Sequence, residues 1–120
     1  MAFDWKEYLD LARFLRVEGG RNITQEAAFR CTVSRAYYAA FCHARNYARD
    51  LQGFSPAYKG KDHWLVRKHF SDRRMLEIVD HLDRLRQWRN RCDYYDTVAG
   101  LDSFLTPAIN KAQEVFDILK

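Results

Sequence analysis

Apolar side chains recur at intervals of three and four positions along most of the chain, which is the spacing of one face of an α-helix. In the first segment they are Trp5, Tyr8, Leu9, Ala12 and Leu15. Asp4 and Glu7 have the spacing of a capping box, and Gly19-Gly20 ends the run, because glycine commonly follows the last turn of a helix. The pattern predicts a first helix between these two signals.

A second segment extends from about Thr24 to Leu51 without a single Gly or Pro. Small residues within it would let a neighbouring helix approach closely. They are Ala27, Ala40, Ala44 and Ala48. The sequence therefore predicts a long helix at the centre of the fold.

Residues 52–62 carry Gly and Pro without periodicity and predict a connection, whereas the aromatic-rich residues 63–70 predict one or two helical turns. Ser71 is suited to cap a further helix that runs to about Asp96. The apolar stripe of this helix consists of Ile78, Leu82, Leu85, Trp88, Cys92 and Tyr95.

The last segment, residues 101–120, again has helical spacing, and Pro107 either opens or kinks its helix. Its apolar positions are Ala108, Ala112, Val115, Phe116 and Leu119. No alternating strand pattern and no repeat occurs in the sequence. We therefore expect an all-α fold in one domain over residues 1–120, an up-down bundle of four main helices plus a short helical piece.

The composition is that of a globular domain, because 48% of the 120 residues are hydrophobic and 15% are aromatic. The amino-terminal residues are acidic and amphipathic, unlike a signal peptide, and no apolar run approaches the roughly 18 residues of a membrane span. The three cysteines lack CxxC spacing, which argues against a disulfide framework and a zinc site. We expect a cytoplasmic protein without a membrane partner and with buried free thiols.

The formal net charge is +4, and the excess of basic residues falls entirely within residues 59–91. Most of the cations are arginines, whose planar guanidinium group suits phosphates and carboxylates. This favours a polyanionic partner, although a solvated helix face is the commoner explanation of such a charge pattern.

Within that basic segment, an apolar helix edge becomes charged without leaving its face. Arg86, Arg89 and Asp93 follow one another at spacings of three and four, so Asp93 is placed to pair with Arg89, while Asn90 and Tyr94 lie beside them. One interpretation is an exposed ion pair worth about 0.5 kcal/mol. The other is a groove between helices or across a dimer, where two arginines bind a phosphate and Asp93 orients one of them.

Two stretches, "SRAYYAAFCHARNYA" at 34–48 and "LDRLRQWRNRCDYYD" at 82–96, together with the final helix, resemble the HEPN family of small helical domains. The resemblance implies a bundle of four or five helices that commonly dimerises, with the signature helices of two chains around one cleft. Many members are metal-independent ribonucleases, and many are toxins paired with nucleotidyltransferase-type antitoxins or parts of defence systems.

The active branch of that family has Arg, a polar residue and then a histidine after four to six further positions. Arg89 and Asn90 match its start, but the histidine positions hold Tyr94, Tyr95 and Asp96. A second branch ends this helix in an Asp-Tyr pair, and there Asp93 takes the place nearest the missing histidine. Metal-free RNA cleavage needs one group to accept a proton and another to donate one, and an aspartic acid, with a reference pKa of about 3.9, is a poor donor at neutral pH. Binding is therefore favoured over catalysis.

Other residues are less specific candidates for a functional site. Arg35 could reach the signature helix from the tyrosine-rich helix, although an exposed arginine is the simpler interpretation. The aromatic and basic side chains of residues 63–70 suit either base stacking or core packing. The four histidines are scattered without an HExxH motif, so we expect neither a metal site nor a cofactor.

Three hypotheses follow. The first is a homodimer that binds RNA or a nucleotide through Arg35, Arg86, Arg89, Asn90 and Tyr94, in a toxin-antitoxin or defence module with a nucleotidyltransferase-type partner. The second is an active metal-independent ribonuclease in which Arg89 acts with Asp93 or a tyrosine. The third is a non-catalytic module whose signature helix docks a protein partner.

Overall fold

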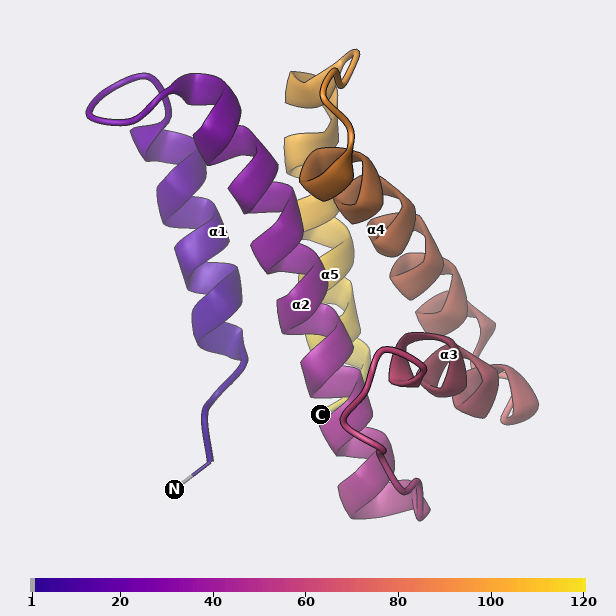
Figure 1. Ribbon diagram of the computed structural model, residues 1–120. Helices are drawn as coiled ribbons and strands as arrows, with labels where there is room; N and C mark the ends of the chain where they lie inside the picture. The colour runs from indigo at the N-terminus through magenta and orange to yellow at the C-terminus, as the bar shows by residue number, and fades with distance from the viewer. Residues whose placement is uncertain (1) are drawn as a thin grey trace.

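The computed structural model describes residues 2–120, which fold into five α-helices and one short 3-10 helix, with no strand (Figure 1). The elements are α1 (Lys6–Glu18), α2 (Gln25–Gln52), α3 (Asp62–Asp72), α4 (Leu76–Tyr94), η1 (Leu101–Phe104) and α5 (Leu105–Ile118). The all-helical prediction is confirmed. None of these helices combines the length and the apolar character that a membrane crossing requires.

The long helix α2 lies at the centre and contacts each of the other α-helices, as Figure 1 shows for α1, α4 and α5 around it. Ala40, Ala44 and Ala48 are completely buried, so small side chains do stand where α2 meets its neighbours. Ala27, in the first turn of α2, is exposed and does not belong to this surface.

Several helix ends follow the sequence signals. Thr24 caps α2, because its hydroxyl oxygen accepts a hydrogen bond from the Ala27 amide at 3.3 Å. Gly53 ends the same helix with a positive φ of 74°, which glycine adopts without steric cost. Pro107 lies in the first turn of α5, where its missing N–H is not needed, so it opens the helix rather than kinking it.

The prediction for residues 63–75 is wrong in two respects. The predicted short piece is a helix of 11 residues, α3, because Val66 and Phe70 bury one of its faces completely. Ser71 lies inside α3 and caps nothing; α4 begins only at Leu76, after a turn in which Arg74 has a φ of 59°. The start of α4 has no side-chain cap.

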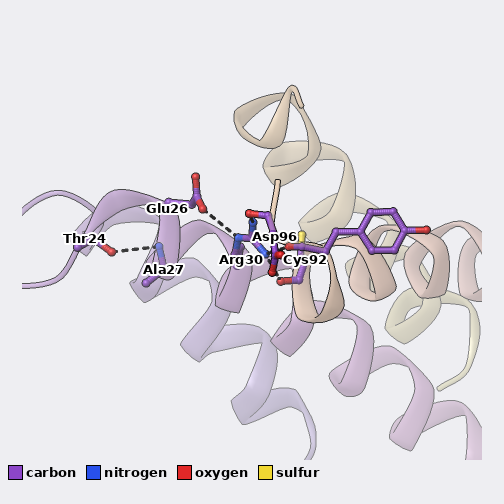
Figure 2. Close-up of polar contacts among 7 residues, drawn as sticks. Thr24, Glu26, Ala27, Arg30, Cys92 and Asp96 are labelled. Carbon is purple, nitrogen blue, oxygen red and sulfur yellow. Dashed lines mark hydrogen bonds and ion pairs between the residues drawn. The ribbon is translucent and has the colours of Figure 1, made fainter. Parts of the chain in front are cut away.

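The carboxyl end of α4 is held by Arg30 of α2 (Figure 2). One nitrogen of its guanidinium group, Nη1, donates to the carbonyls of Cys92 at 2.9 Å and Tyr95 at 2.6 Å, and Nη2 donates to that of Asp96 at 3.0 Å. These carbonyls have no helical partner, and a cation there also suits the helix dipole. The helix accordingly ends at Tyr94, two residues earlier than predicted, and Tyr95 is exposed instead of joining the apolar stripe.

The thiols also differ in part from expectation. All three cysteines are free, and Cys42 and Cys92 are buried as predicted, but Cys31 on α2 is exposed.

Candidate functional site

Arg89 lies near the carboxyl end of α4 and is only 7% exposed. The central carbon of its guanidinium group lies 5.1 Å and 5.3 Å from the ring centres of Tyr37 and Tyr38 on α2, and 5.8 Å from that of Tyr94. Cation–π contacts of this kind strengthen where water is excluded. The interpretation of Arg89 as an exposed surface charge is therefore wrong.

The charge of Arg89 is weakly compensated. The expected ion pair with Asp93 forms at 3.9 Å, and Nη1 donates to the Tyr94 hydroxyl at 3.4 Å, which is long for a hydrogen bond. Its Nε is buried and has no hydrogen-bond partner among the residues that the structure describes. Removing a cation from water is costly unless close partners replace the water, so this guanidinium group has unused capacity for an anion.

A short relay of polar contacts joins Arg35 to the same place. The hydroxyl of Ser34, a buried residue, donates to Oδ2 of Asp93 at 3.2 Å, and Nη2 of Arg35 donates to the Ser34 oxygen, also at 3.2 Å. Arg35 thus reaches α4 only through Ser34. The side chain of Asp93 is about 29% exposed, so solvent still reaches the pair that it forms with Arg89.

Arg86 pairs with Asp83 rather than with Asp93. Its Nη2 lies 2.8 Å from Oδ1 of Asp83, and Nε of Arg67 on α3 lies 3.9 Å from the same oxygen. The hydrogen bond from Arg86 holds the pKa of Asp83 below its usual value. The pKa of Arg67 is lowered, chiefly by burial and then by the nearby Arg86. Three arginines, 67, 86 and 89, thus gather with two carboxylates, and we call this group the arginine cluster.

Tyr37 and His63 form the inner wall of the arginine cluster. The Tyr37 hydroxyl is hydrogen-bonded to Nδ1 of His63, as expected for a core tyrosine with a bonded hydroxyl. Burial raises the pKa of Tyr37 well above its usual range. Burial lowers the pKa of His63, and the positive charges of Arg89 and Arg67 lower it further, so the imidazole is neutral at neutral pH.

The remaining predicted site residues lie at the edge of the arginine cluster. Asn90 is half-buried and makes no side-chain hydrogen bond within residues 2–120. Tyr94 is 72% exposed, with its hydroxyl toward Arg89. The arrangement offers a buried cation, further arginines and an exposed aromatic ring side by side, which suits a ligand with both a phosphate and a flat base.

One group of side chains elsewhere has the composition of a metal site. His81 of α4 lies between Glu77 and Glu114, with Nε2 at 3.5 Å from Oε1 of Glu77 and 2.6 Å from Oε2 of Glu114. The shorter contact is direct, and Nδ1 is buried without a partner, whereas a metal-bound histidine usually donates its second N–H to an acceptor. The contact with Glu77 lies within α4, and the contact with Glu114 joins α4 to α5.

Three residues of the site were not singled out from the sequence: Ser34, Arg67 and Asp83. The sequence made His63 a candidate for base stacking, and weak signals existed for two of the three, because Ser34 directly precedes Arg35 and Arg67 belongs to the aromatic and basic segment at 63–70. Their meeting with Arg89 depends on the packing of α2 and α3 against α4. Comparisons with protein-family models, with curated proteins and with solved structures return no match for this chain.

Proposed function

We propose that the chain is a HEPN-like domain that binds RNA or a nucleotide at the arginine cluster. The observation that carries the proposal is the buried and weakly paired guanidinium group of Arg89. A phosphate oxygen would supply the close anionic partner that Asp93, at 3.9 Å, does not. Charged groups with unusual surroundings gather at functional sites more often than elsewhere.

The neighbours of Arg89 favour nucleic acid over a simple anion. Arg86 and Arg67 share one carboxylate, Asp83, so their combined charge is only partly neutralised. Tyr94 exposes a ring whose centre lies 5.8 Å from the guanidinium carbon of Arg89, and an aromatic ring stacks on any unpaired base. The excess of basic residues in 59–91 adds long-range attraction for a polyanion.

The finer features of the HEPN resemblance belong to this proposal. In it, α1, α2, α4 and α5 form the four main helices of an up-down bundle, and α3 is the additional short helix. Two copies form a homodimer whose α4 helices face one cleft, within a toxin-antitoxin or defence module that includes a nucleotidyltransferase-type protein. The molar mass in solution, measured by light scattering, tests the dimer.

RNA binding is tested by the fluorescence anisotropy of a labelled single-stranded RNA at several salt concentrations. Arg86→Gln should weaken binding and lower the salt slope by about 0.7 for each phosphate that the variant no longer binds. Arg84→Gln is the matched control, because Arg84 lies on the same helix, is exposed and contacts Trp88 instead of the arginine cluster. If Arg86→Gln and Arg84→Gln decreased the affinity equally, the decrease would come from the lower net charge and not from a contact at the arginine cluster.

A wild-type protein that binds no RNA at low salt would overturn the proposal. The third hypothesis, a non-catalytic module that docks a protein partner through α4, would then be preferred.

One observation also favours the ribonuclease as a second candidate function. Arg89 and His63 both contact Tyr37, so a neutral imidazole from α3 lies in the arginine cluster. The histidine that the active HEPN motif would place on α4 after Arg89 is replaced by Tyr94, Tyr95 and Asp96. The imidazole of His63 can accept a proton, and once protonated it is a better donor at neutral pH than an aspartic acid. RNA cleavage in the presence of EDTA should be compared for wild type, His63→Asn and Asp93→Asn. Cleavage that both variants retain would exclude these residues from catalysis.

A further inference from the structure

A pocket of about 510 Å³ opens between the start of α1, the middle of α2 and the loop that precedes α3. It lies beside the arginine cluster and shares Tyr38 and His63 with it. Its size is within the range of small-molecule sites, roughly 300 to 1,000 Å³. The sequence analysis named Arg35, one of its lining residues, as a candidate for nucleotide binding, but it did not predict the pocket.

Two arginines of α2 lie among the aromatic rings of this pocket. The guanidinium carbon of Arg35 lies 5.0 Å from the ring centre of Tyr8 and 5.4 Å from that of Tyr38. Farther along α2, Arg45 lies 5.8 Å from the ring of Trp5 and 5.2 Å from that of Tyr58. The ten positions between the two arginines correspond to about 15 Å along the helix. The pocket is thus bounded by two cations that aromatic rings hold in place.

The charged lining of the pocket is mainly basic. Within residues 2–120, Arg35, Arg45 and Lys59 form no ion pair. The pocket contains one carboxylate, that of Asp62, whose two oxygens accept hydrogen bonds from the backbone amides of Ala57 at 3.0 Å and Tyr58 at 2.7 Å. Because Asp62 is 2% exposed and engaged in this way, the surface of the pocket carries an excess of positive charge.

Tyr58 is held at the rim in an unfavourable backbone conformation. Its φ is 56°, in the left-handed region that a bulky side chain rarely adopts, and the side chain is largely exposed. The buried carboxylate of Asp62 fixes its amide, and Nη1 of Arg49 donates to its hydroxyl at 3.0 Å. Strain of this kind persists at sites where the constrained residue has a task. The ring is therefore placed for contact with something other than the core.

We infer that this pocket binds one nucleotide, with the base stacked on its aromatic rings and the phosphate contacted by Arg45 and Lys59, while Arg35 lies at the opposite end of the pocket. A nucleotide combines the flat π-face and the negative charge that this lining fits. The choice of a nucleotide rests on the proposed function, whereas the location of the pocket does not. Tyr38 contacts both Arg35 and Arg89, so a strand bound at the arginine cluster can continue into the pocket.

The sharpest test is Tyr58→Gly, because glycine adopts this φ freely and the exposed ring contributes little to the core. We expect a melting temperature at or above that of wild type, together with nucleotide binding weakened at least about fivefold, because the base no longer stacks on this ring. Arg45→Gln should weaken binding as well. Arg21→Gln, at the far end of α1 in an exposed pair with Glu18, is the control for charge.

Two kinds of ligand separate the sources of the nucleotide: the free monophosphates of adenosine and uridine, measured by calorimetry, and a labelled single-stranded RNA, measured by anisotropy. If wild type binds the monophosphates and Tyr58→Gly weakens this binding, the pocket binds free nucleotides. If the protein binds no monophosphate but Tyr58→Gly weakens RNA binding, the pocket binds one nucleotide of a strand. Affinities unchanged in both Tyr58→Gly and Arg45→Gln would overturn the inference.

The same measurements distinguish this inference from the proposed function. If Arg86→Gln weakens RNA binding and the pocket variants do not, the arginine cluster is the site and the pocket is not. If only the pocket variants weaken binding, the pocket is a binding site and the arginine cluster is not. Absence of any binding by wild type would overturn both.

Discussion

Arg89 is the residue whose position is hardest to explain by stability alone. It is buried against Tyr37 and Tyr38, yet its closest carboxylate is 3.9 Å away and its Nε has no partner. Replacing a buried ion pair with apolar side chains of similar size is often neutral or stabilising, and here the remaining partner, Asp93, is reached by solvent and would not become a buried unpaired charge. We expect Arg89→Met to leave the free energy of unfolding within about 1 kcal/mol of wild type, or to raise it, while RNA binding is abolished. Urea denaturation and anisotropy measure the two effects.

The comparison variant is Leu85→Ala, one turn earlier on the same buried face of α4. It removes buried apolar atoms from the core and should cost about 2 to 5 kcal/mol. If Arg89→Met destabilised the protein as severely as Leu85→Ala, Arg89 would be a structural residue and its weak pairing would carry no functional meaning.

The thiols should differ sharply in reactivity. Burial raises the pKa of both Cys42 and Cys92 to about 11, so almost no reactive thiolate forms there near neutral pH, whereas Cys31 is exposed. We expect a disulfide reagent to modify one thiol per chain rapidly in the folded protein and the other two only after denaturation. Cys31→Ser should remove the rapid phase; a rapid phase that persisted in this variant would contradict the assignment.

At the residue scale, sequence reasoning could place neighbours on one helix but not residues that meet across helices. The spacing of four between Arg89 and Asp93 was sufficient to predict their pairing. The burial of Arg89 was not predictable, since Tyr37 and Tyr38 come from α2. The pair of Asp83 and Arg86, three positions apart on α4, was predictable from spacing but was not singled out.

At the scale of elements, the end of α4 depends on one side chain of α2. We expect Arg30→Gln to lower the free energy of unfolding by about 2 to 3 kcal/mol, because three carbonyls lose a charged donor at the carboxyl end of α4. Urea denaturation measures the decrease, and amide exchange in residues 90–96 should rise, since the last turn would open more often.

Glu26→Gln is the control for Arg30→Gln. Glu26 is exposed and pairs with Nε of Arg30 at 3.2 Å, so its removal breaks an ion pair without touching the carbonyls. A change of less than about 1 kcal/mol is expected for such a pair. If both variants were equally destabilising, the bonds from Arg30 to the carbonyls of α4 would add no stability beyond that of the ion pair within α2.

The helices themselves were largely predictable, because periodic apolar positions and Thr24, Gly53 and Pro107 act locally. The errors arose where residues distant in the sequence determine the end of a helix. α3 extends through Ser71 because Val66 and Phe70 are buried by other helices. The end of α4 follows Arg30, which is 62 positions from the first carbonyl that it binds. A local pattern contains no information about such partners.

At the scale of the whole molecule, the absence of strand alternation gave the fold class, and charge counting located the basic segment. Neither reveals that α3 returns to α4, which brings Arg67 and His63 beside Arg89. The pocket beside them is also a product of assembly, because its lining comes from α1, α2 and the loop before α3. Both candidate binding regions therefore exist only in the folded chain.

The packing of α3 against α2 and α4 makes stability depend on pH. Burial lowers the pKa of His63, helped by Arg89 and Arg67 and opposed by Asp62, and burial lowers the pKa of His69, helped by Arg73. The unfolded chain, with a histidine pKa of about 6.5, binds protons that the folded protein does not, so stability is complete above this pH and is lost as the pH falls below it.

We therefore expect the melting temperature, followed by circular dichroism, to fall as the pH is lowered from about 7 to about 5. A second decrease should follow below about pH 4, because the unfolded carboxyl binds protons near its reference pKa of about 3.9, while Arg86 holds the pKa of Asp83 lower in the folded protein. Replacing His63 and His69 together with glutamine should flatten the first decline and leave the second. If the decline between pH 7 and pH 5 were as steep in that double variant as in wild type, the buried face of α3 would not be its origin, and the two histidines would be as accessible to protons in the folded chain as in the unfolded one.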